Sequence, residues 1–274
     1  MVIQLTVRLI AFDLDDTALR PDASLAPETA AALERCGRAG ILLVPASGRA
    51  LSSLPQELLG ICGVSYAISS NGAAVTRLKD GERIFERKLS PEAVVSVLGA
   101  FPDMLPECFI DGTPYSDERY VADPLSYGCS PAYVGYVQST RTPVRDIRGF
   151  ILENADRLDG LDLLCPDLET RERCLLSAKT LSGIYVTSSS PRLVEFAAPD
   201  AGKGAALRAL CERLDISPAD TVAFGNGDND ADMLRFAGLG IAVKNASPKC
   251  LSAADRICGG NFENGVAGAL EELL

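Results

Sequence analysis

The chain has 274 residues, and 26 Lys and Arg against 37 Asp and Glu give it a formal net charge of −11. It contains no histidine, which excludes Ser-His-Asp and Cys-His hydrolases, His-ligated zinc or haem sites, and imidazole as a general base. The acidic balance, without any run of Lys or Arg, argues against nucleic acid or an anionic membrane as a partner.

The cysteines and the N-terminal residues indicate the compartment. Nine cysteines form no Cys-x-x-Cys pair and their number is odd, which is typical of reduced thiols. Residues 1–8 are interrupted by Gln4 and Arg8 and run into an acidic cluster, so we do not expect a signal peptide. No stretch approaches the roughly 20 apolar residues of a membrane span. We therefore expect a cytoplasmic protein.

The predicted elements alternate between strand and helix. Residues 7–12 form a short apolar run that is typical of a buried parallel strand. The elements that follow are helix 27–39, strand 41–46, helix 51–59 and strand 64–68. Late in the chain come helix 203–214, strand 221–224 and strand 239–243. This order predicts a doubly wound, Rossmann-like α/β fold, whose ligand site lies beyond the carboxyl ends of the strands.

The pattern changes between residues 85 and 193. There it includes helix 91–99, a turn cluster at 110–114 and an alternating strand at 183–187. We interpret this segment as an α+β domain inserted into the first one. The expected organisation is a core of residues 1–84 and 194–274 and an inserted domain of residues 85–193.

The most informative stretch places three carboxylates, Asp13, Asp15 and Asp16, at the end of the first predicted strand. Two carboxylates about 4 Å apart repel by roughly 4 kcal/mol at an effective dielectric near 20, so a raised pKa, a bound cation or a lysine must offset the repulsion. Asp13 and Asp15 lie two residues apart, and in extended backbone they project to the same side. The alternative is an ordinary acidic turn, because Asp and Thr are common turn residues.

Three further segments favour a site for phosphate and a cation. Ser47 and Gly48 offer a hydroxyl and backbone amides at a strand end, although Ser-Gly is also an everyday turn. Lys203 begins an amphipathic helix, where the helix dipole and the ammonium favour an anion, although an exposed lysine is the ordinary alternative. The oxygen-rich loop that suits a hard cation such as Mg²⁺ consists of Asn226, Asp228, Asn229 and Asp230.

Competing motifs fail on spacing. The loop after residue 225 lacks the glycine and the glutamate that an EF-hand needs at fixed positions. Lys203 is followed by glycine, whereas a Walker A loop needs Ser or Thr there. Gly225-x-Gly227 lacks the third glycine of a dinucleotide-binding loop.

In their order along the chain, these motifs resemble those of the haloacid dehalogenase superfamily of phosphatases, and most of all its Cof-like group with an α/β cap. The matching segments are FDLDDT at 12–17, ASGR at 46–49, SNGA at 70–73, GKGAAL at 202–207, FGNGDNDADML at 224–234 and KNAS at 244–247. The resemblance implies a Mg²⁺-dependent phosphatase acting on a small phosphorylated metabolite, such as a sugar phosphate or a related cofactor, with the inserted domain as the cap that sets specificity.

The resemblance also implies roles for individual residues. Asp13 would be the nucleophile that forms an aspartyl-phosphate, and Asp15 the acid and base. The implied phosphate-binding residues are Ser47, Gly48, Lys203, Asn71, Gly72 and Asn229, and the implied metal ligands are Asp13, Asp15, Asn226 and Asp230. For Asn71 and Gly72, a simple Asn-Gly turn is an equal alternative.

Asn226 departs from the family pattern, since most members carry aspartate at that position. An amide oxygen is a neutral ligand, so we expect weaker Mg²⁺ binding, and Asp228 is an alternative ligand.

Other functions also fit parts of the pattern. A sugar phosphomutase of the same fold would return the phosphoryl group to its substrate. A signalling receiver places its phosphorylated Asp after the third strand, whereas Asp13 follows the first, and a non-catalytic phosphate-binding regulatory protein stays open. In the inserted domain the polar candidates for substrate contact are Asp111, Tyr115, Tyr127 and Arg141. Neither the substrate nor the oligomeric state follows from the sequence.

Overall fold

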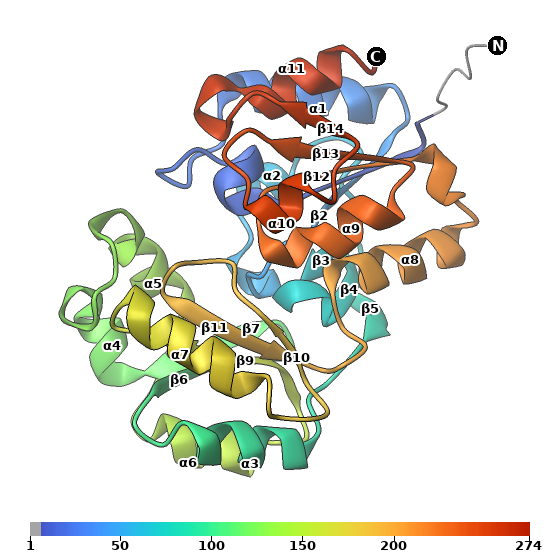
Figure 1. Cartoon of the computed structure of the whole chain (residues 1–274). Helices are drawn as coiled ribbons and strands as arrows, with labels where there is room; N and C mark the ends of the chain where they lie inside the picture. Colours follow the sequence, from blue (N-terminus) through green and yellow to red (C-terminus); the bar gives the residue numbers. More distant parts are fainter. Residues whose placement is uncertain (1–6) are drawn as a thin grey trace. The chain divides into compact units, whose positions relative to one another are not determined.

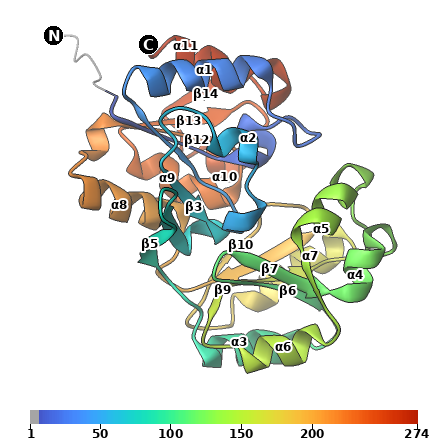
Figure 2. The same cartoon turned by 180° about the vertical axis from the view of Figure 1, so that it is seen from behind.

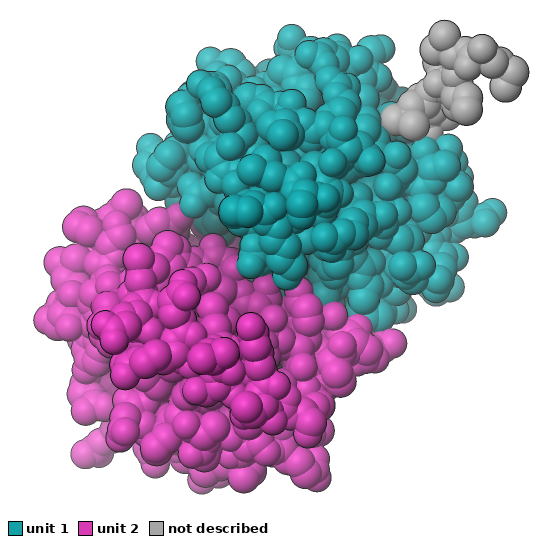
Figure 3. Space-filling view, viewed as in Figure 1, with its two compact units in different colours: residues 1–48, 54–85, 202–274 teal, residues 49–53, 86–201 magenta. Residues whose placement is uncertain are grey.

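The computed structural model describes residues 7–274; most of the segment examined for a signal peptide, residues 1–6, lies outside the described residues. The chain divides into two compact units (Figure 3). Unit 1 comprises the residues up to 48 together with 54–85 and 202–274, and unit 2 comprises 49–53 and 86–201. Among the described residues, no helix is both long and apolar enough to cross a membrane.

Unit 1 is built on a five-stranded parallel sheet in the order β14-β13-β12-β1-β2 (Figure 1). Its strands are β1 (Leu9–Phe12), β2 (Leu42–Pro45), β12 (Thr221–Gly225), β13 (Leu239–Val243) and β14 (Arg256–Cys258). All four residues of β1 are buried, as both faces of a parallel sheet are covered by helices. In the register, Phe12 lies between Pro45 and Phe224, so three strands end at one level.

The strand order reverses beside β1. From β1 the chain continues to β2 on one side, whereas β12, β13 and β14 follow in turn on the other side. Such a switch point leaves a crevice at the carboxyl ends of the strands. The expected doubly wound α/β fold is thereby confirmed, and the sequence motifs at the ends of β1, β2 and β12 fall at this crevice.

Helices cover both faces of the sheet (Figures 1 and 2). One face carries α1 (Pro27–Arg38) and α11 (Gly265–Glu271), which lie side by side. The other packs against α8 (Lys203–Leu214), α9 (Ala231–Phe236) and α10 (Pro248–Leu251). In α8 the predicted apolar stripe is buried at Leu207, Leu210 and Cys211, which holds the start of this helix beside the crevice.

Two elements of unit 1 differ from the sequence-based expectation. Helix 51–59 is split into a turn, η2 (Leu51–Ser53), and α2 (Gln56–Leu59), because Pro55 has an extended backbone and disfavours helix at the residue before it. The expected strand 64–68 is β3 (Tyr66–Ser69), which pairs antiparallel with β4 (Ala74–Arg77). With β5 (Glu82–Glu86) it forms a separate three-stranded sheet, joined to the parallel strands by two isolated bridges.

Unit 2 contains a six-stranded sheet in the order β10-β11-β9-β6-β7-β8. Its strands are β6 (Leu105–Ile110), β7 (Thr113–Asp117), β8 (Thr142–Val144), β9 (Leu158–Leu164), β10 (Tyr185–Thr187) and β11 (Leu193–Ala197). The helices are α3 (Pro91–Ala100), α4 (Glu118–Ala122), α5 (Val134–Thr140), α6 (Ile147–Glu153) and α7 (Leu168–Ala178). An inserted α+β domain is what the change of pattern predicts.

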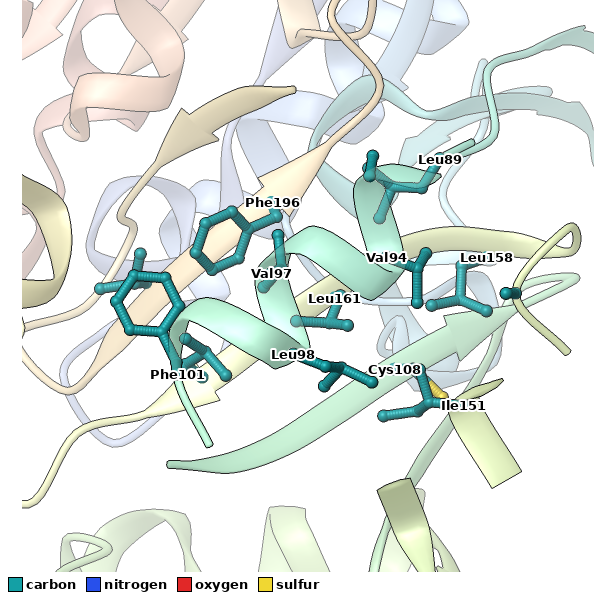
Figure 4. Packing of buried hydrophobic residues seen from close by; sticks show 14 of the residues in the cluster. Leu89, Val94, Val97, Leu98, Phe101, Cys108, Ile151, Leu158, Leu161 and Phe196 are labelled. Carbon is teal, nitrogen blue, oxygen red and sulfur yellow. The ribbon is translucent and has the colours of Figure 1, made fainter. Parts of the chain in front are cut away.

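The core of unit 2 lies between this sheet and three of the helices (Figure 4). Cys108, Leu161 and Phe196 come from three neighbouring strands, and Val94 and Ile151 come from α3 and α6. Cys174 and Ala178 of α7 belong to the same cluster. One face of the sheet is therefore apolar, and alternation along each strand turns the intervening side chains to the other face.

The division into units differs from the expected one in two segments. Residues 194–201, expected in the core, lie in unit 2, because β11 pairs antiparallel with β9. Residues 49–53 also lie in unit 2, where the Ser52 amide donates to the Gly112 carbonyl at 3.0 Å. A local sequence pattern indicates a strand or a turn but not the unit against which it packs. The sequence-based division therefore assigned both segments to the core.

Candidate active site

Asp13 is the first residue after β1, and it is buried. The chain then forms a single wide turn, η1 (Leu14–Ala18), in which the Leu19 amide donates to the Leu14 carbonyl at 2.8 Å. Within this turn Asp15 keeps an extended backbone, with φ −65° and ψ 127°, and its negative charge is among those that raise the pKa of Asp13. Asp15 is partly exposed, whereas Asp16 adopts a φ of 57°, which Asp tolerates better than most residues.

Thr17 links Asp13 to the oxygen-rich loop. Its hydroxyl lies 2.8 Å from Asp13 Oδ2 and 3.1 Å from Asn226 Oδ1. A hydroxyl carries a single proton, so the two acceptor oxygens converge on one donor. These two oxygens are ligands of the kind that a hard cation binds.

Lys203 is completely buried, with 0% of its surface exposed. Its Nζ lies 2.7 Å from Asp13 Oδ1 and 2.6 Å from Asp230 Oδ1. Burial alone would lower the pKa of Lys203, but the two carboxylates raise it well above its usual range. Burial and the charge of Asp230 raise the pKa of Asp13, and Lys203 opposes that shift. Lys203 is therefore a permanent cation that offsets the acidic pair.

Asp230 shapes the loop after β12. Its Oδ2 accepts hydrogen bonds from the Asn226 and Gly227 amides at 2.9 and 2.8 Å, while Oδ1 faces Lys203. Gly225 makes room for this side chain, since a Cβ there would lie 2.4 Å from the Asp230 Cβ. Both carboxylate oxygens thus have protein donors.

The ends of β2, β3 and β12 are joined by hydrogen bonds. The Asn71 amide donates to the Ser47 carbonyl at 3.1 Å, and Asn229 Nδ2 donates to Asn71 Oδ1 at 2.9 Å. Ser47, Asn71 and Asn229 are all buried. Gly48 is the last residue of unit 1 before residues 49–53.

Gly72 allows two segments to approach closely. It has a φ of 85°, and a Cβ at this position would lie 2.2 Å from the carbonyl carbon and oxygen of Gly202 and 2.7 Å from the Lys203 amide nitrogen. The turn η3 (Ser70–Gly72) therefore rests directly on the start of α8. Gly72 thus has a packing role that the Asn-Gly pattern did not reveal.

We expect Gly72→Ala to lower the free energy of unfolding by far more than the strain of its left-handed backbone accounts for. A left-handed φ costs a non-glycine residue about 1–2 kcal/mol, and here a clash with backbone is added. Gly81→Ala is the matched control, because Gly81 has a φ of 75° and nothing within 4 Å of its Cβ position. Urea unfolding of both variants measures the difference, and equal losses would contradict the close-contact explanation.

Sequence reasoning missed Thr17 and Asp232. Asp232 Oδ2 accepts the Gly204 amide at 3.0 Å, and Oδ1 accepts the Met233 amide at 2.9 Å. The N-cap of α8, Gly202, has no side chain to cap the helix, so Asp232 supplies a carboxylate from another element, where the helix dipole favours it. Both residues lie inside the matched motifs, yet only their contacts reveal these roles.

The remaining members of the motifs anchor the loops. Asp228 Oδ1 accepts the Ser247 hydroxyl at 2.6 Å, and Asn245 Nδ2 donates to the Asp16 carbonyl at 2.9 Å. Asp228 is therefore held by the segment after β13, whereas Asn226 is the residue whose amide oxygen approaches Asp13 through Thr17.

The polar candidates of unit 2 have ordinary partners within that unit. Asp111 accepts Lys88 Nζ at 2.8 Å and Arg157 at 2.7 Å, and these bonds lower its pKa to about 2. The ring centroid of Tyr115 lies 4.8 Å from that of Phe150. The two other candidates, Tyr127 and Arg141, contact the Tyr120 ring and the Glu107 carboxylate.

Unit 2 also holds an acidic cluster whose ligand atoms all lie within 4.8 Å of one another: Glu86, Asp111 and Asp159. This cluster is able to hold a metal ion, and none of its members is one of the metal ligands expected from the sequence. Lys88 Nζ already lies 3.4 Å from Glu86 and 4.0 Å from Asp159, so this lysine offsets part of the negative charge of the cluster.

A doubly wound sheet that gathers carboxylates, a buried lysine, a hydroxyl and an oxygen-rich loop at its strand ends is suited to chemistry on phosphate groups. The model of the haloacid dehalogenase-like hydrolases matches residues 10–270. The chain belongs to this family, and it is an enzyme.

Known relatives agree with this assignment. The chain is 30% identical over 248 residues to the HMP-PP phosphatase of Cronobacter sakazakii, covering 89% of this chain and 87% of that protein. A haloacid dehalogenase-like hydrolase from B. subtilis has a solved structure with a TM-score of 0.82 and 26% identity, covering 98% of this chain and all of that one. The subclass IIB sugar phosphatase BT4131 shares the fold, with a TM-score of 0.79 at 18% identity and coverage of 98% and 100%.

Proposed function

We propose that the protein is a Mg²⁺-dependent phosphatase that hydrolyses a small phosphorylated metabolite through an aspartyl-phosphate on Asp13. The observation that carries this proposal is the buried lysine: Lys203 holds Asp13 and Asp230 at 2.7 and 2.6 Å at the carboxyl end of the central strand. Removing three charged groups from water into the protein interior costs desolvation free energy. Their retention at a strand-end crevice is typical of a reactive site rather than of a stabilising ion pair.

In the first step, an oxygen of Asp13 attacks phosphorus while the bond to the leaving oxygen breaks, and Asp15 gives that oxygen a proton. In the second step, Asp15 takes a proton from water, which attacks the aspartyl-phosphate and releases phosphate and free Asp13. The buried Asp13 is held by Lys203 at one oxygen and by Thr17 at the other, so it is oriented before the substrate binds. Asp15 is partly exposed, as a group that exchanges protons with water must be.

The phosphoryl oxygens would be bound by Lys203, the Ser47 hydroxyl and the amide of Gly48. Asn229 donates to Asn71 and supports this side of the pocket. Donors that are fixed before reaction stabilise charge that develops in the transition state without reorganising. Gly72 contributes here by letting η3 approach α8, and its amide is a further proposed phosphate contact.

The residues present fit a divalent cation. Asp13 Oδ2 and Asn226 Oδ1 share the Thr17 proton, so both oxygens have capacity left for a cation, with Asp15 as the further ligand. Asp230 acts by shaping the loop, because its oxygens are engaged by Lys203 and two amides. Bound Mg²⁺ would neutralise charge on the phosphoryl group and on Asp13.

We expect Asn226→Asp to lower the Mg²⁺ concentration needed for half-maximal activity. The change adds a negative charge to an oxygen that already lies near Asp13, and hard cations favour carboxylates over amides. Activity titrated with Mg²⁺ measures the effect, and Asp228→Asn is the control, since Asp228 is bonded to Ser247. An unchanged Mg²⁺ requirement in Asn226→Asp would remove Asn226 from the ligand set.

The experiment that tests the function is phosphate release from a panel of phosphorylated sugars, nucleotides and cofactors, with and without Mg²⁺. A phosphatase releases free phosphate, whereas a mutase of this fold keeps the phosphoryl group on its substrate. Complete absence of Mg²⁺-dependent release across the panel would overturn the proposal. We further propose that unit 2 is the cap that selects among these substrates.

A further inference from the structure

Two asparagines of unit 1 hold the turn η1 from outside. Asn245 follows β13, and Asn261 begins the short turn η8 (Asn261–Glu263) after β14. Asn245 Nδ2 donates to the Asp16 carbonyl at 2.9 Å. Asn261 Nδ2 donates to the Asp16 carboxylate at 3.3 Å and to the Leu19 carbonyl at 3.1 Å. We call Asn245 and Asn261 the asparagine pair.

The two asparagines also support each other. The Asn261 backbone amide donates to Asn245 Oδ1 at 3.0 Å, and Asn261 is buried. An asparagine side chain carries two N–H donors, and the bonds to Asp16 and Leu19 employ both of those on Asn261. The asparagine pair is therefore one connected hydrogen-bond network, in which each member helps to orient the other.

The pair holds the turn where its backbone is least ordinary. Asp16 has a φ of 57°, whereas Asp15 before it is extended. A positive φ is uncommon outside glycine, and it persists where the surrounding structure enforces it. The Leu19 amide closes the ends of the turn by donating to the Leu14 carbonyl at 2.8 Å. The asparagine pair adds bonds in the middle of the turn, directly beside Asp15.

The segment that supplies Asn245 also contacts the oxygen-rich loop. Ser247 donates its amide to the Asn226 carbonyl at 2.8 Å and its hydroxyl to Asp228 Oδ1 at 2.6 Å. Asn245 and Ser247 are two residues apart, so one short segment joins η1 to the loop that we assign to the cation. The relative positions of Asp15 and Asn226 are thus fixed from outside the proposed ligand set.

We propose that Asn245 and Asn261 are positioning residues for Asp15, which fix η1 so that the Asp15 carboxyl reaches the leaving oxygen of the substrate. This inference rests on the proposed phosphatase function. Asp13 and Thr17 are buried and bonded to each other, so they keep their places without the pair. Asp15 is partly exposed, and its position depends on the backbone of the turn.

The direct test compares two leaving groups at saturating Mg²⁺. Nitrophenolate is a stable anion and leaves without a proton, whereas an alkoxide needs the proton that Asp15 gives. The substrates are p-nitrophenyl phosphate and the alkyl phosphate that the wild-type protein hydrolyses fastest in the panel assay. The value of kcat/KM reports the steps up to the aspartyl-phosphate, so the later role of Asp15 as a base does not enter.

We expect Asn261→Ala to lower kcat/KM for the alkyl phosphate by about ten- to a hundredfold, since a misplacement near 1 Å costs about a hundredfold. For p-nitrophenyl phosphate we expect a loss of less than about threefold, because its leaving group needs no acid. Asn245→Ala should act in the same direction and more weakly, as it removes a single bond to η1. Equal losses for both substrates, or no loss, would overturn the inference.

Glu263→Gln is the matched control. Glu263 Oε2 accepts the Gly260 amide at 3.1 Å, and its Oε1 lies 3.7 Å from Lys244 Nζ, so both partners lie outside η1. We expect this variant to keep the wild-type ratio of the two kcat/KM values. A change of the ratio as large as that in Asn261→Ala would show that the ratio follows the stability of η8, and the positioning role would be wrong.

Amide hydrogen exchange gives a readout that needs neither substrate nor Mg²⁺. Exchange becomes faster where a segment opens more easily. We expect Asn261→Ala to raise the exchange rate within residues 14–19 and to leave residues 9–12 of β1 at the wild-type rate. Unchanged exchange within residues 14–19 would show that the turn does not depend on the asparagine pair, which would also overturn the inference.

Failure of the proposed function is seen separately, as the absence of phosphate release by the wild-type protein in the panel assay. A wild-type phosphatase whose two kcat/KM values fall equally in Asn261→Ala would keep the proposed function and contradict the positioning role alone.

Discussion

Asp13→Asn should reduce phosphate release by at least about 10⁴-fold at saturating substrate and Mg²⁺. An amide oxygen is a poor nucleophile and does not form the aspartyl-phosphate, so the change removes the covalent route rather than weakening one contact. The substitution preserves shape, which keeps the positions facing Lys203 and Thr17 filled. Steady-state phosphate release and intact-protein mass after brief exposure to substrate measure the effect.

The same variant should remain folded. Burial raises the pKa of Asp13, so the charged carboxylate is itself a cost to the folded state, and Lys203 keeps Asp230 as a partner. We expect a Tm equal to or above that of the wild-type protein. Turnover within a hundredfold of wild type in a folded Asp13→Asn protein would rule out Asp13 as the nucleophile.

Lys203→Met should both unfold the protein more easily and abolish its activity. The change keeps the length of the side chain but leaves Asp13 and Asp230 buried without their cation. Removing one partner of a buried ion pair costs about 3–5 kcal/mol, a large part of a typical stability of about 5–15 kcal/mol. Urea unfolding at pH 7 measures the loss.

Arg213→Met is the matched control for Lys203→Met, since Arg213 is an exposed residue of the same helix, α8. Exposed substitutions of this kind change stability by about 0.5 kcal/mol or less. The double variant Lys203→Met with Asp230→Asn should regain part of the lost stability but none of the activity, because one carboxylate is neutralised while the phosphate-binding cation stays absent. Wild-type stability in Lys203→Met would show that the ion pair is not essential to the fold.

The motifs were predictable because each is local. Apolar runs of four to six residues followed by small polar residues identified the strands, and parallel strands place their carboxyl ends along one edge. That rule brings Asp13 near the 226–230 loop although more than 200 residues separate them. It did not predict that Lys203 contacts both Asp13 and Asp230, because a contact across 190 residues depends on how α8 docks.

The close approach of separate segments was not predictable in the same way. Asp13 and Asp15 were expected to share a side, and the structure adds that Asp15 lies in the turn η1 with an extended backbone. Gly72 matched a phosphate-binding motif, and the structure adds close packing against Gly202. The sequence pattern around Gly72 carries no information about this neighbouring backbone.

The amino-acid sequence by itself limited the kind of chemistry: without histidine, carboxylates, lysine, hydroxyls, thiols or a metal remain. The oxygen-rich motifs at the strand ends then favour phosphate and a hard cation. Only the tertiary structure decided which groups share a proton, which glycine position has no room for a Cβ, and to which unit residues 194–201 belong. Three buried carboxylates of unit 2 show the difference most clearly, because Glu107, Asp162 and Glu195 come from three separate strands. Strand register and burial made them neighbours, and these depend on packing across the whole unit.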